Sequence, residues 1–350
     1  MIKRVMICII MIVLIVGFLS AEIKIVSKQN ITVIDYDENA LSKIAYIEPP
    51  VRIEEGYNGE LIVLKDTFFE VFDKTGKRIK RVGNRGQGPG DFISIGSMLK
   101  YKNRYYFLDF PGKISVFDKN FNFKKRFYLG GAKISTFLYS FDICNDKIYA
   151  NQFYLKRKTK TQRFFDTIIE YDMSGKIINH FLDEKELNKI FPVLFLISGK
   201  IKIINGKILF SMVSYPKFWV FSKKGKLLKE KEFDFKWWVK TVYNEKKYER
   251  DKIKMGDGAL AKAIFTGTYI YAFDRYKGKL VVHVIRTPYE DPQHGFVMFD
   301  ENLKILKNWT QIKGYQYSGA GKKYLYFSKT VRYIEDKNLK EVEILKCEVK

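Results

Sequence analysis

The sequence predicts an all-β protein: a six-bladed β-propeller of four-stranded antiparallel blades, with a short helical insertion between blades 4 and 5. Three observations lead to this fold. One β-hairpin phrase recurs six times, the copies are 36 to 78 residues apart, and the chain is 46% hydrophobic and 16% aromatic. A propeller blade is a small sheet that cannot bury its faces alone, so such repeats must pack side by side. The 350 residues therefore indicate one closed body.

The repeated phrase is an apolar strand ending in an aromatic residue and an acid, then a tight turn with a lysine, then a second strand. The six copies turn at Asp73, Asp118, Asp172, Ser222, Asp300 and Asp336. The first residue of such a turn can bond its side chain to backbone amides two residues further on. Three copies place a glycine where the backbone needs a positive φ, and these are Gly76, Gly175 and Gly225. In the other copies we expect asparagine to adopt it, at Asn120, Asn302 and Asn338.

Antiparallel pairing also predicts the rim on which each loop lies. Successive turns of a four-stranded blade fall at alternate ends, so loops between second and third strands share a rim with the connections between blades. We expect all six repeated turns on the opposite, uniform rim. Function is expected on the variable rim, with residues 156–163, 183–186, 288–294 and the insertion at about 235–264.

The N-terminus has the pattern of an export signal. Lys3 and Arg4 precede an apolar run over residues 5–19, and two small residues follow. We assign residues 1–21 to a signal peptide and 22–350 to a single propeller domain. The run is shorter than the about 20 residues that span a bilayer, which favours cleavage. A bulky leucine near the cut leaves an uncleaved anchor as the alternative. Whether the signal is cleaved or kept as an anchor, the propeller domain is expected to be periplasmic or extracellular.

The net charge of +24 predicts attraction to polyanions. Export argues against nucleic acid, so a protein or an anionic polysaccharide is the expected partner, with a membrane surface as a further alternative. The lysines are spread along the whole chain, which fits a generally lysine-rich composition equally well. We expect a monomer. Cys144 and Cys347 are expected to be free thiols, and no Cys/His spacing indicates a zinc site.

The most specific stretch is the glycine-rich segment 81–92, which reads RVGNRGQGPGDF and is followed by RYYFLD and KISVFD. This pattern resembles the NHL repeat, and the chain is similar to exported six-bladed β-propeller proteins of bacteria whose blades carry a GQGPGxF phrase. The full pattern covers residues 69–129, and elsewhere only its hairpin half recurs. The resemblance implies a closed NHL-like propeller used mostly for binding, although some relatives by fold are lactonases or lyases.

The glycines from Gly83 to Gly90 do not fit a phosphate-binding loop. Such a loop needs a helix directly after it, and the residues after Phe92 have the pattern of a strand. The segment is therefore expected to connect two blades. Arg85, beside its backbone amides, remains a candidate for a weak anion site.

Aromatic and basic residues of the variable rim are the other binding candidates. Trp237 and Trp238 could stack on sugars or anchor a protein partner, although packing of the insertion onto the ring is favoured. The full set of candidates is Arg85, Lys156, Arg157, Lys158, Lys160, Arg163, Trp237, Trp238 and His294.

The case for an enzyme is weak, and no catalytic residue is assigned. Of three histidines, His180 follows a repeated hairpin, His283 alternates within a strand, and His294 is placed in a variable loop. Glu290 and Asp291 beside it could share an acid–base site or hold calcium through oxygen ligands, but a solvated polar loop is favoured. No cofactor is predicted, and calcium is the one metal under consideration.

Two functions remain open. The first is an exported binding module for an envelope glycan, lipid or protein, acting through the variable rim. The alternative is a metal-assisted lactonase or lyase that uses carboxylates at the central channel.

The ring must also close. The segments 23–26 and 31–34 have strand patterns, and we expect one of them to pair with the last blade near residues 341–345, covering a strand edge.

Overall fold

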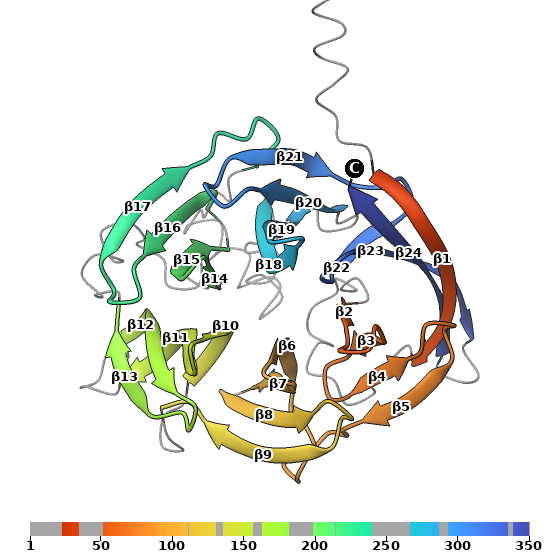
Figure 1. Cartoon of the computed structure of the whole chain (residues 1–350), viewed down its shortest axis with the longest axis horizontal. Helices are drawn as coiled ribbons and strands as arrows, with labels where there is room; N and C mark the ends of the chain where they lie inside the picture. The colour runs from red at the N-terminus through yellow and green to blue at the C-terminus, as the bar shows by residue number, and fades with distance from the viewer. Residues whose placement is uncertain are drawn as a thin grey trace, which may run out of the picture.

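The computed structural model describes residues 23–34, 52–110, 112–130, 136–156, 163–181, 199–213, 215–239, 267–286, 293–334 and 339–349. They form six four-stranded antiparallel sheets that stand as blades around one axis (Figure 1). The predicted six-bladed propeller is therefore confirmed. The described ranges contain no helix. The predicted helical insertion is covered only up to residue 239, and the predicted signal at 1–21 lies outside these ranges.

Each of the first five blades is one stretch of chain, with its strands in sequence order from the axis outwards (Figure 1). Blade 1 contains β2 (Arg52–Glu55), β3 (Leu61–Leu64), β4 (Phe69–Phe72) and β5 (Arg78–Val82). Blade 2 contains β6 (Ile95–Tyr101), β7 (Arg104–Asp109), β8 (Lys113–Asp118) and β9 (Phe123–Tyr128). Blade 3 contains β10 (Thr136–Cys144), β11 (Lys147–Lys156), β12 (Arg163–Asp172) and β13 (Ile177–His180).

The second half of the ring has the same construction. Blade 4 contains β14 (Gly199–Ile204), β15 (Lys207–Met212), β16 (Lys217–Phe221) and β17 (Leu227–Glu232). Blade 5 contains β18 (Thr268–Tyr276), β19 (Lys279–Arg286), β20 (Gln293–Phe299) and β21 (Ile305–Thr310). Blade 6 contains β22 (Gln316–Ala320), β23 (Leu325–Ile334), β24 (Leu339–Val349) and, as its outermost strand, β1 (Ile23–Ile34).

The apolar core lies between neighbouring blades. Middle strands are buried on both faces because each blade packs against two others, and all four residues of β3 are buried. Between blades 1 and 2, the rings of Phe69 and Phe107 stack with centroids 4.4 Å apart, and Phe92 and Phe117 belong to the same cluster. The aromatic residues that are abundant in the sequence thus fill the interfaces between blades.

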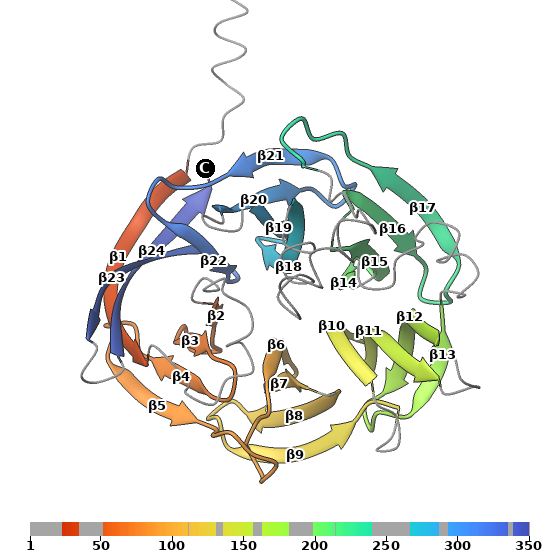
Figure 2. The ribbon, with the colours of Figure 1, turned by 180° about the vertical axis from the view of Figure 1, so that it is seen from behind.

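The N-terminal strand closes the ring. β1 pairs antiparallel with β24 along its length, beginning with Ile23 opposite Val349 (Figures 1 and 2). Ile31 and Val33 are buried in a core cluster that blade 6 shares with blade 1. The predicted pairing with the last blade is confirmed, and the two predicted segments belong to a single strand.

The repeated turns have the hydrogen bonds that their acids predict. In the first copy, Asp73 Oδ1 accepts the backbone N–H of Thr75 at 2.8 Å and that of Lys77 at 3.0 Å. The same two bonds recur in the copies at Asp118, Asp172 and Asp300. Each carboxylate therefore fixes the backbone of its own turn.

The asparagines of these turns do not adopt the conformation predicted for them. The three predicted glycines have positive φ, but in the second and fifth copies positive φ occurs one residue after Asn120 and Asn302. It falls on Phe121 and Leu303, each with φ of 62°. Both side chains are buried in the core, so packing offsets the strain of this backbone conformation. Asn338 lies outside the described residues.

The two rims of the ring carry different connections. One rim carries the turns between first and second strands and between third and fourth strands, and we call it the hairpin rim. The other rim carries the turns between second and third strands and the connections between blades, and we call it the crossover rim. The repeated turns at Asp73, Asp118, Asp172, Ser222 and Asp300 join third to fourth strands, on the hairpin rim as predicted.

The sixth copy, at Asp336, lies outside the described residues. The described strands before and after it, β23 and β24, are the second and third strands of blade 6 rather than the third and fourth. The phrase specifies a tight turn but not its place in a blade. Blade 6 takes its fourth strand from the N-terminus, so no third-to-fourth turn follows β24.

The glycine-rich connection between blades 1 and 2 is built around a buried ring. Gly83 and Gly90 have φ of 89° and 86°. A Cβ at Gly83 would lie 2.7 Å from the ring of Phe92, which is fully buried. The amides of Gly86 and Phe92 donate to main-chain carbonyls, and strand β6 follows. The predicted role as a blade connection is confirmed.

Asp109 holds this connection from within blade 2. Its Oδ1 accepts the N–H groups of Ile93 and Ser94, both at 2.8 Å, and its Oδ2 lies 3.3 Å from Lys113 Nζ. Both charged side chains are almost completely buried. The acid at the end of the RYYFLD strand therefore joins the entry of blade 2 to its second strand.

Candidate functional site

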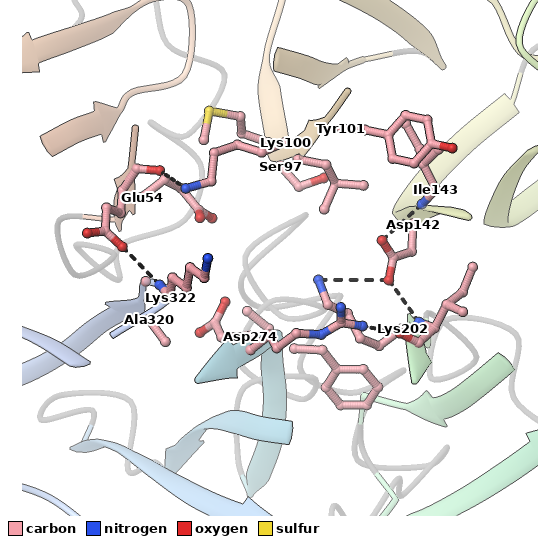
Figure 3. A pocket seen from close by; sticks show the side chains of 18 of the residues that line it. Glu54, Ser97, Lys100, Tyr101, Asp142, Ile143, Lys202, Asp274, Ala320 and Lys322 are labelled. Atoms are coloured by element: carbon pink, nitrogen blue, oxygen red, sulfur yellow. Dashed lines mark hydrogen bonds and ion pairs between the residues drawn. The ribbon is translucent and has the colours of Figure 1, made fainter. Parts of the chain in front are cut away.

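A cavity of about 1160 Å³ opens on the propeller axis at the hairpin rim. Its wall consists of the innermost strand of every blade and the turn that follows each of these strands (Figure 3). Because six inner strands converge on one axis, side chains far apart in the sequence reach the same space. The sequence analysis placed function on the crossover rim, whereas this cavity lies at the opposite one.

Charged side chains make up about a third of the lining residues, and basic ones are in excess. Eight are basic: Arg52, Lys100, Lys200, Lys202, Arg275, Lys277, Lys322 and Lys323. Four are acidic: Glu54, Glu55, Asp142 and Asp274. A concave, partly enclosed wall with such an excess produces a positive potential inside.

Arg52 forms two hydrogen bonds on one side of the cavity. Its guanidinium donates to Gly96 O at 2.9 Å and to Glu54 Oε1 at 3.2 Å. Nearby, the Tyr317 hydroxyl donates to Asp274 Oδ2 at 2.9 Å. Burial raises the pKa of both Glu54 and Asp274, and the positive charge of Arg52 opposes that rise. Protein groups thus already engage both acids.

Asp142 links blades 3 and 4 at the cavity wall. Its Oδ1 accepts the N–H of Ile143 at 2.9 Å, and its Oδ2 accepts the N–H of Ile203 at 2.8 Å. Lys202 Nζ lies 3.9 Å from the same Oδ2 (Figure 3). This carboxylate has a structural role in joining two inner strands.

The wall on the side of blades 6, 1 and 2 is held by contacts to the backbone. Lys100 Nζ donates to Glu55 O and, at 3.4 Å, to Gly56 O. Glu55 Oε2 accepts the N–H of Lys322 at 2.9 Å. Burial lowers the pKa of Lys100, and neighbouring carboxylates oppose that shift. The side chain of Lys322 remains exposed at the mouth of the cavity.

Lys200, on β14, differs from the other cavity lysines. Its side chain is half-buried, and no ion pair or hydrogen bond joins its amine to any residue that the structure describes. Burial lowers the pKa of Lys200 to about 8, and the positive charge of Arg52 adds to this shift. Lys200 thus carries an amine with unusually weak affinity for its proton.

Two histidines form a buried pair behind the cavity wall. His283 Nε2 and His294 Nδ1 are 3.1 Å apart, on neighbouring strands β19 and β20. The ring of His283 also meets the rings of Tyr271 and Tyr317 edge-on, each at 4.9 Å between centroids. Since Tyr271 lines the cavity, the pair is one side chain away from it.

His294 is therefore not in a loop, as the sequence analysis placed it, but inside β20 with 2% of its surface exposed. Its proposed neighbours, Glu290 and Asp291, lie outside the described residues. His283 is a strand residue, as predicted.

Three other predicted binding residues, Arg85, Trp237 and Trp238, are described and do not line the cavity. Arg85 is exposed on the connection between blades 1 and 2 and pairs through its backbone with Phe92. Lys156 and Arg163 are opposite each other at the ends of β11 and β12, on the crossover rim as expected. Their side chains, and all of Arg157, Lys158 and Lys160, lie outside the described part.

The two tryptophans pack against blade 5. Trp237 stacks on Phe235 with centroids 4.8 Å apart, meets Trp309 at 5.1 Å, and donates from Nε1 to Asn308 Oδ1 at 2.7 Å. Trp238 is half-buried against the core cluster between blades 4 and 5. These contacts are the packing alternative that the sequence analysis favoured.

Sequence reasoning missed the cavity residues, although a signal for them exists. In Arg52-Ile53-Glu54 and Lys200-Ile201-Lys202, charged residues alternate with fully buried isoleucines on innermost strands. On such a strand one face packs against the next blade and the other meets the axis. Recognising this required knowledge of which strand of each blade is innermost.

In the described part of the chain, no group of three or more His, Cys, Asp or Glu side chains is placed to hold a metal ion. The structure there also contains no helix long and apolar enough to cross a membrane. Cys144 and Cys347 are free thiols, as predicted.

Comparisons with known proteins agree with this architecture. A protein of Bacteroides fragilis, provisionally assigned as exported, superposes with a TM-score of 0.56 at 13% identity, over 94% of this chain and 95% of its own. A DUF4221 family member from Bacteroides vulgatus gives a TM-score of 0.55 at 10% identity, over 94% and 99%. No curated protein matches the chain. Residues 47–338 match the model of the family DUF5128, described as a 6-bladed beta-propeller, and the chain therefore belongs to that family.

Proposed function

We propose that this protein is an exported binding module that takes an anionic ligand into its axial cavity. The observation that carries the proposal is the cavity lining, where eight basic side chains from five blades face four acids. The three acids Glu54, Asp142 and Asp274 are already engaged by protein donors, so basic groups are in surplus for an incoming anion.

The size of the cavity supports a small ligand or the end of a larger one. Its volume of about 1160 Å³ lies slightly above the range of roughly 300–1,000 Å³ typical of small-molecule sites. An acidic oligosaccharide end or an acidic peptide segment would fit this space. The anionic polysaccharide or protein expected from the sequence remains the proposed partner class, and the whole chain's charge of +24 would assist its approach.

Export rests on the sequence of residues 1–21, with a periplasmic or extracellular location as its consequence. The Bacteroides fragilis protein of similar fold, which is provisionally assigned as exported, is consistent with it. The glycine-rich phrase, which forms the connection between blades 1 and 2, supports the NHL-like reading of those two blades.

The test is binding of a uronic-acid oligosaccharide by residues 22–350, compared with a neutral oligosaccharide of equal length. Lys322→Glu at the cavity mouth is paired with Lys229→Glu on the exposed outer strand β17, so both variants carry the same charge change. We expect binding of the acidic ligand only, weakened by salt, and at least about tenfold weaker in Lys322→Glu alone. Equal binding of both oligosaccharides, or equal loss in both variants, would refute the proposal.

The alternative function, a metal-assisted lactonase or lyase, is tested by the unfolding temperature of the same protein. This temperature is measured before EDTA, after EDTA, and after calcium is added back. A native-state metal would raise the unfolding temperature, because a ligand stabilises the state that binds it. A large reversible drop with EDTA would shift the assignment to that alternative.

A further inference from the structure

Lys200 is placed where an amine could react with a bound ligand. It stands on β14, the innermost strand of blade 4, and its side chain lines the axial cavity. The side chain is half-buried, so it is surrounded by protein on several sides yet open to the cavity. A ligand that enters along the axis would therefore meet its amine directly.

No described carboxylate compensates the charge of Lys200. Glu54 is bonded to Arg52, and Asp274 accepts from Tyr317. Asp142 accepts two backbone amides and faces Lys202 instead. The charged group that acts on Lys200 is the guanidinium of Arg52, which has the same sign.

A lysine that lies close to another cation and is partly desolvated favours its neutral, nucleophilic form. Lys200 fits this description, and its pKa of about 8, lowered mainly by burial, agrees with it. The basic lining of the cavity has a second use, because its excess of positive charge attracts a carboxylate. The basic lining and Lys200 together thus suit a ligand that carries a carboxylate next to a reactive carbon.

We propose that Lys200 is an amine nucleophile that forms an imine with the carbonyl carbon of a small oxo acid, whose carboxylate the basic lining of the cavity attracts. The inference rests on the proposed binding of anions in this cavity. The Lys200 nitrogen attacks the carbonyl carbon, a C–N bond forms, and the carbonyl oxygen leaves as water with the two amine protons. The product is a C=N bond, and the step requires no oxidant or reductant.

The test is reductive trapping with glyoxylate, an aldehyde that carries a carboxylate, in the presence of cyanoborohydride near pH 7. Trapping converts the reacting lysine to its N-carboxymethyl form, which peptide mass spectrometry locates. A lysine with a pKa of about 8 has on the order of 100-fold more free amine at pH 7 than an ordinary lysine. Because nucleophilicity falls with pKa, we expect Lys200 to be labelled about tenfold faster than exposed lysines.

Two variants and one competitor complete the design. Lys200→Arg should remove the fast label, while Lys229→Arg, the same change on the exposed outer strand β17, should retain it. Glycolate, which carries the same charge but no carbonyl, should slow the labelling of Lys200. Labelling of Lys200 at the rate of exposed lysines would overturn the proposal. If glycolate still binds in that case, anion binding stands without imine chemistry; if neither compound binds, both proposals fail.

Discussion

His283 Nε2 lies 3.1 Å from His294 Nδ1, and both rings are buried between the second and third strands of blade 5. His283 pairs with Phe296 and His294 with Ile285, so the two histidines are diagonal neighbours on one face of the sheet. One ring nitrogen must donate and the other accept, which requires at least one neutral ring.

We predict that the free energy of unfolding decreases as the pH falls from about 6.5 to about 4. Burial lowers the pKa of His294 to about 4 and holds that of His283 well below 6.5, with the charge of His294 adding to the latter shift. In this window the unfolded chain binds more protons than the folded one, so acid favours unfolding. The shift of His294 corresponds to about 3 kcal/mol. Urea unfolding across this pH range measures it.

Matched variants separate the contribution of the histidines to the pH dependence of stability from that of the carboxylates. Burial raises the pKa of Glu54 and Asp274, which changes stability in the opposite direction as pH falls. His294→Gln should flatten the pH dependence, whereas His180→Gln, at an exposed position on β13, should leave it as it is. If the unfolding free energy of His294→Gln still falls with pH as steeply as that of the unchanged protein, the histidine pair does not cause the pH dependence.

The second prediction concerns ring closure by β1. Ile31 is 2% exposed in the cluster between blades 6 and 1, and Ile25 on the same strand is 53% exposed. Ile31→Ala should therefore lower the free energy of unfolding by about 3 kcal/mol, and Ile25→Ala by less than about 0.5 kcal/mol. Denaturant unfolding of both variants decides this. Equal effects would mean that β1 does not contribute to the core.

The third prediction concerns the unexpected positive φ of Leu303. Leu303→Ala removes buried methyl groups and keeps the strained conformation, so it should cost about 3 kcal/mol. Leu303→Gly removes slightly more surface but relieves about 1 kcal/mol of strain. We expect the glycine variant to melt at the same temperature as the alanine variant or higher. A clearly lower melting temperature would contradict strain at this position.

The fourth prediction concerns the buried pair Asp109 and Lys113. Asp109→Ala removes two hydrogen bonds to the blade connection and leaves the Lys113 charge buried, so a loss of about 3–5 kcal/mol is expected. Adding Lys113→Met should recover part of this loss, because no unpaired charge then remains. Chemical unfolding of the single and double variants measures the coupling. If the double variant is no more stable than Asp109→Ala, the buried charge of Lys113 is not the cause of the stability loss.

Local sequence determined the hairpins, their count and the closure of the ring. An acid at the start of each turn bonds to amides two and four residues on, so the phrase at Asp73 specifies its turn without help from distant residues. A strand pattern at residues 23–34 and an unpaired edge at the last blade were likewise sufficient to predict their pairing.

Tertiary structure alone decided three other properties. Phe121 and Leu303 adopt positive φ because buried packing outweighs the backbone preference that favours asparagine. The last copy of the phrase connects the second and third strands of blade 6, because the fourth strand of that blade comes from the other end of the chain. The cavity joins Arg52 to Lys200, residues separated by more than two blades in sequence. Their presence in one cavity depends on the convergence of six inner strands on one axis, which no local pattern encodes.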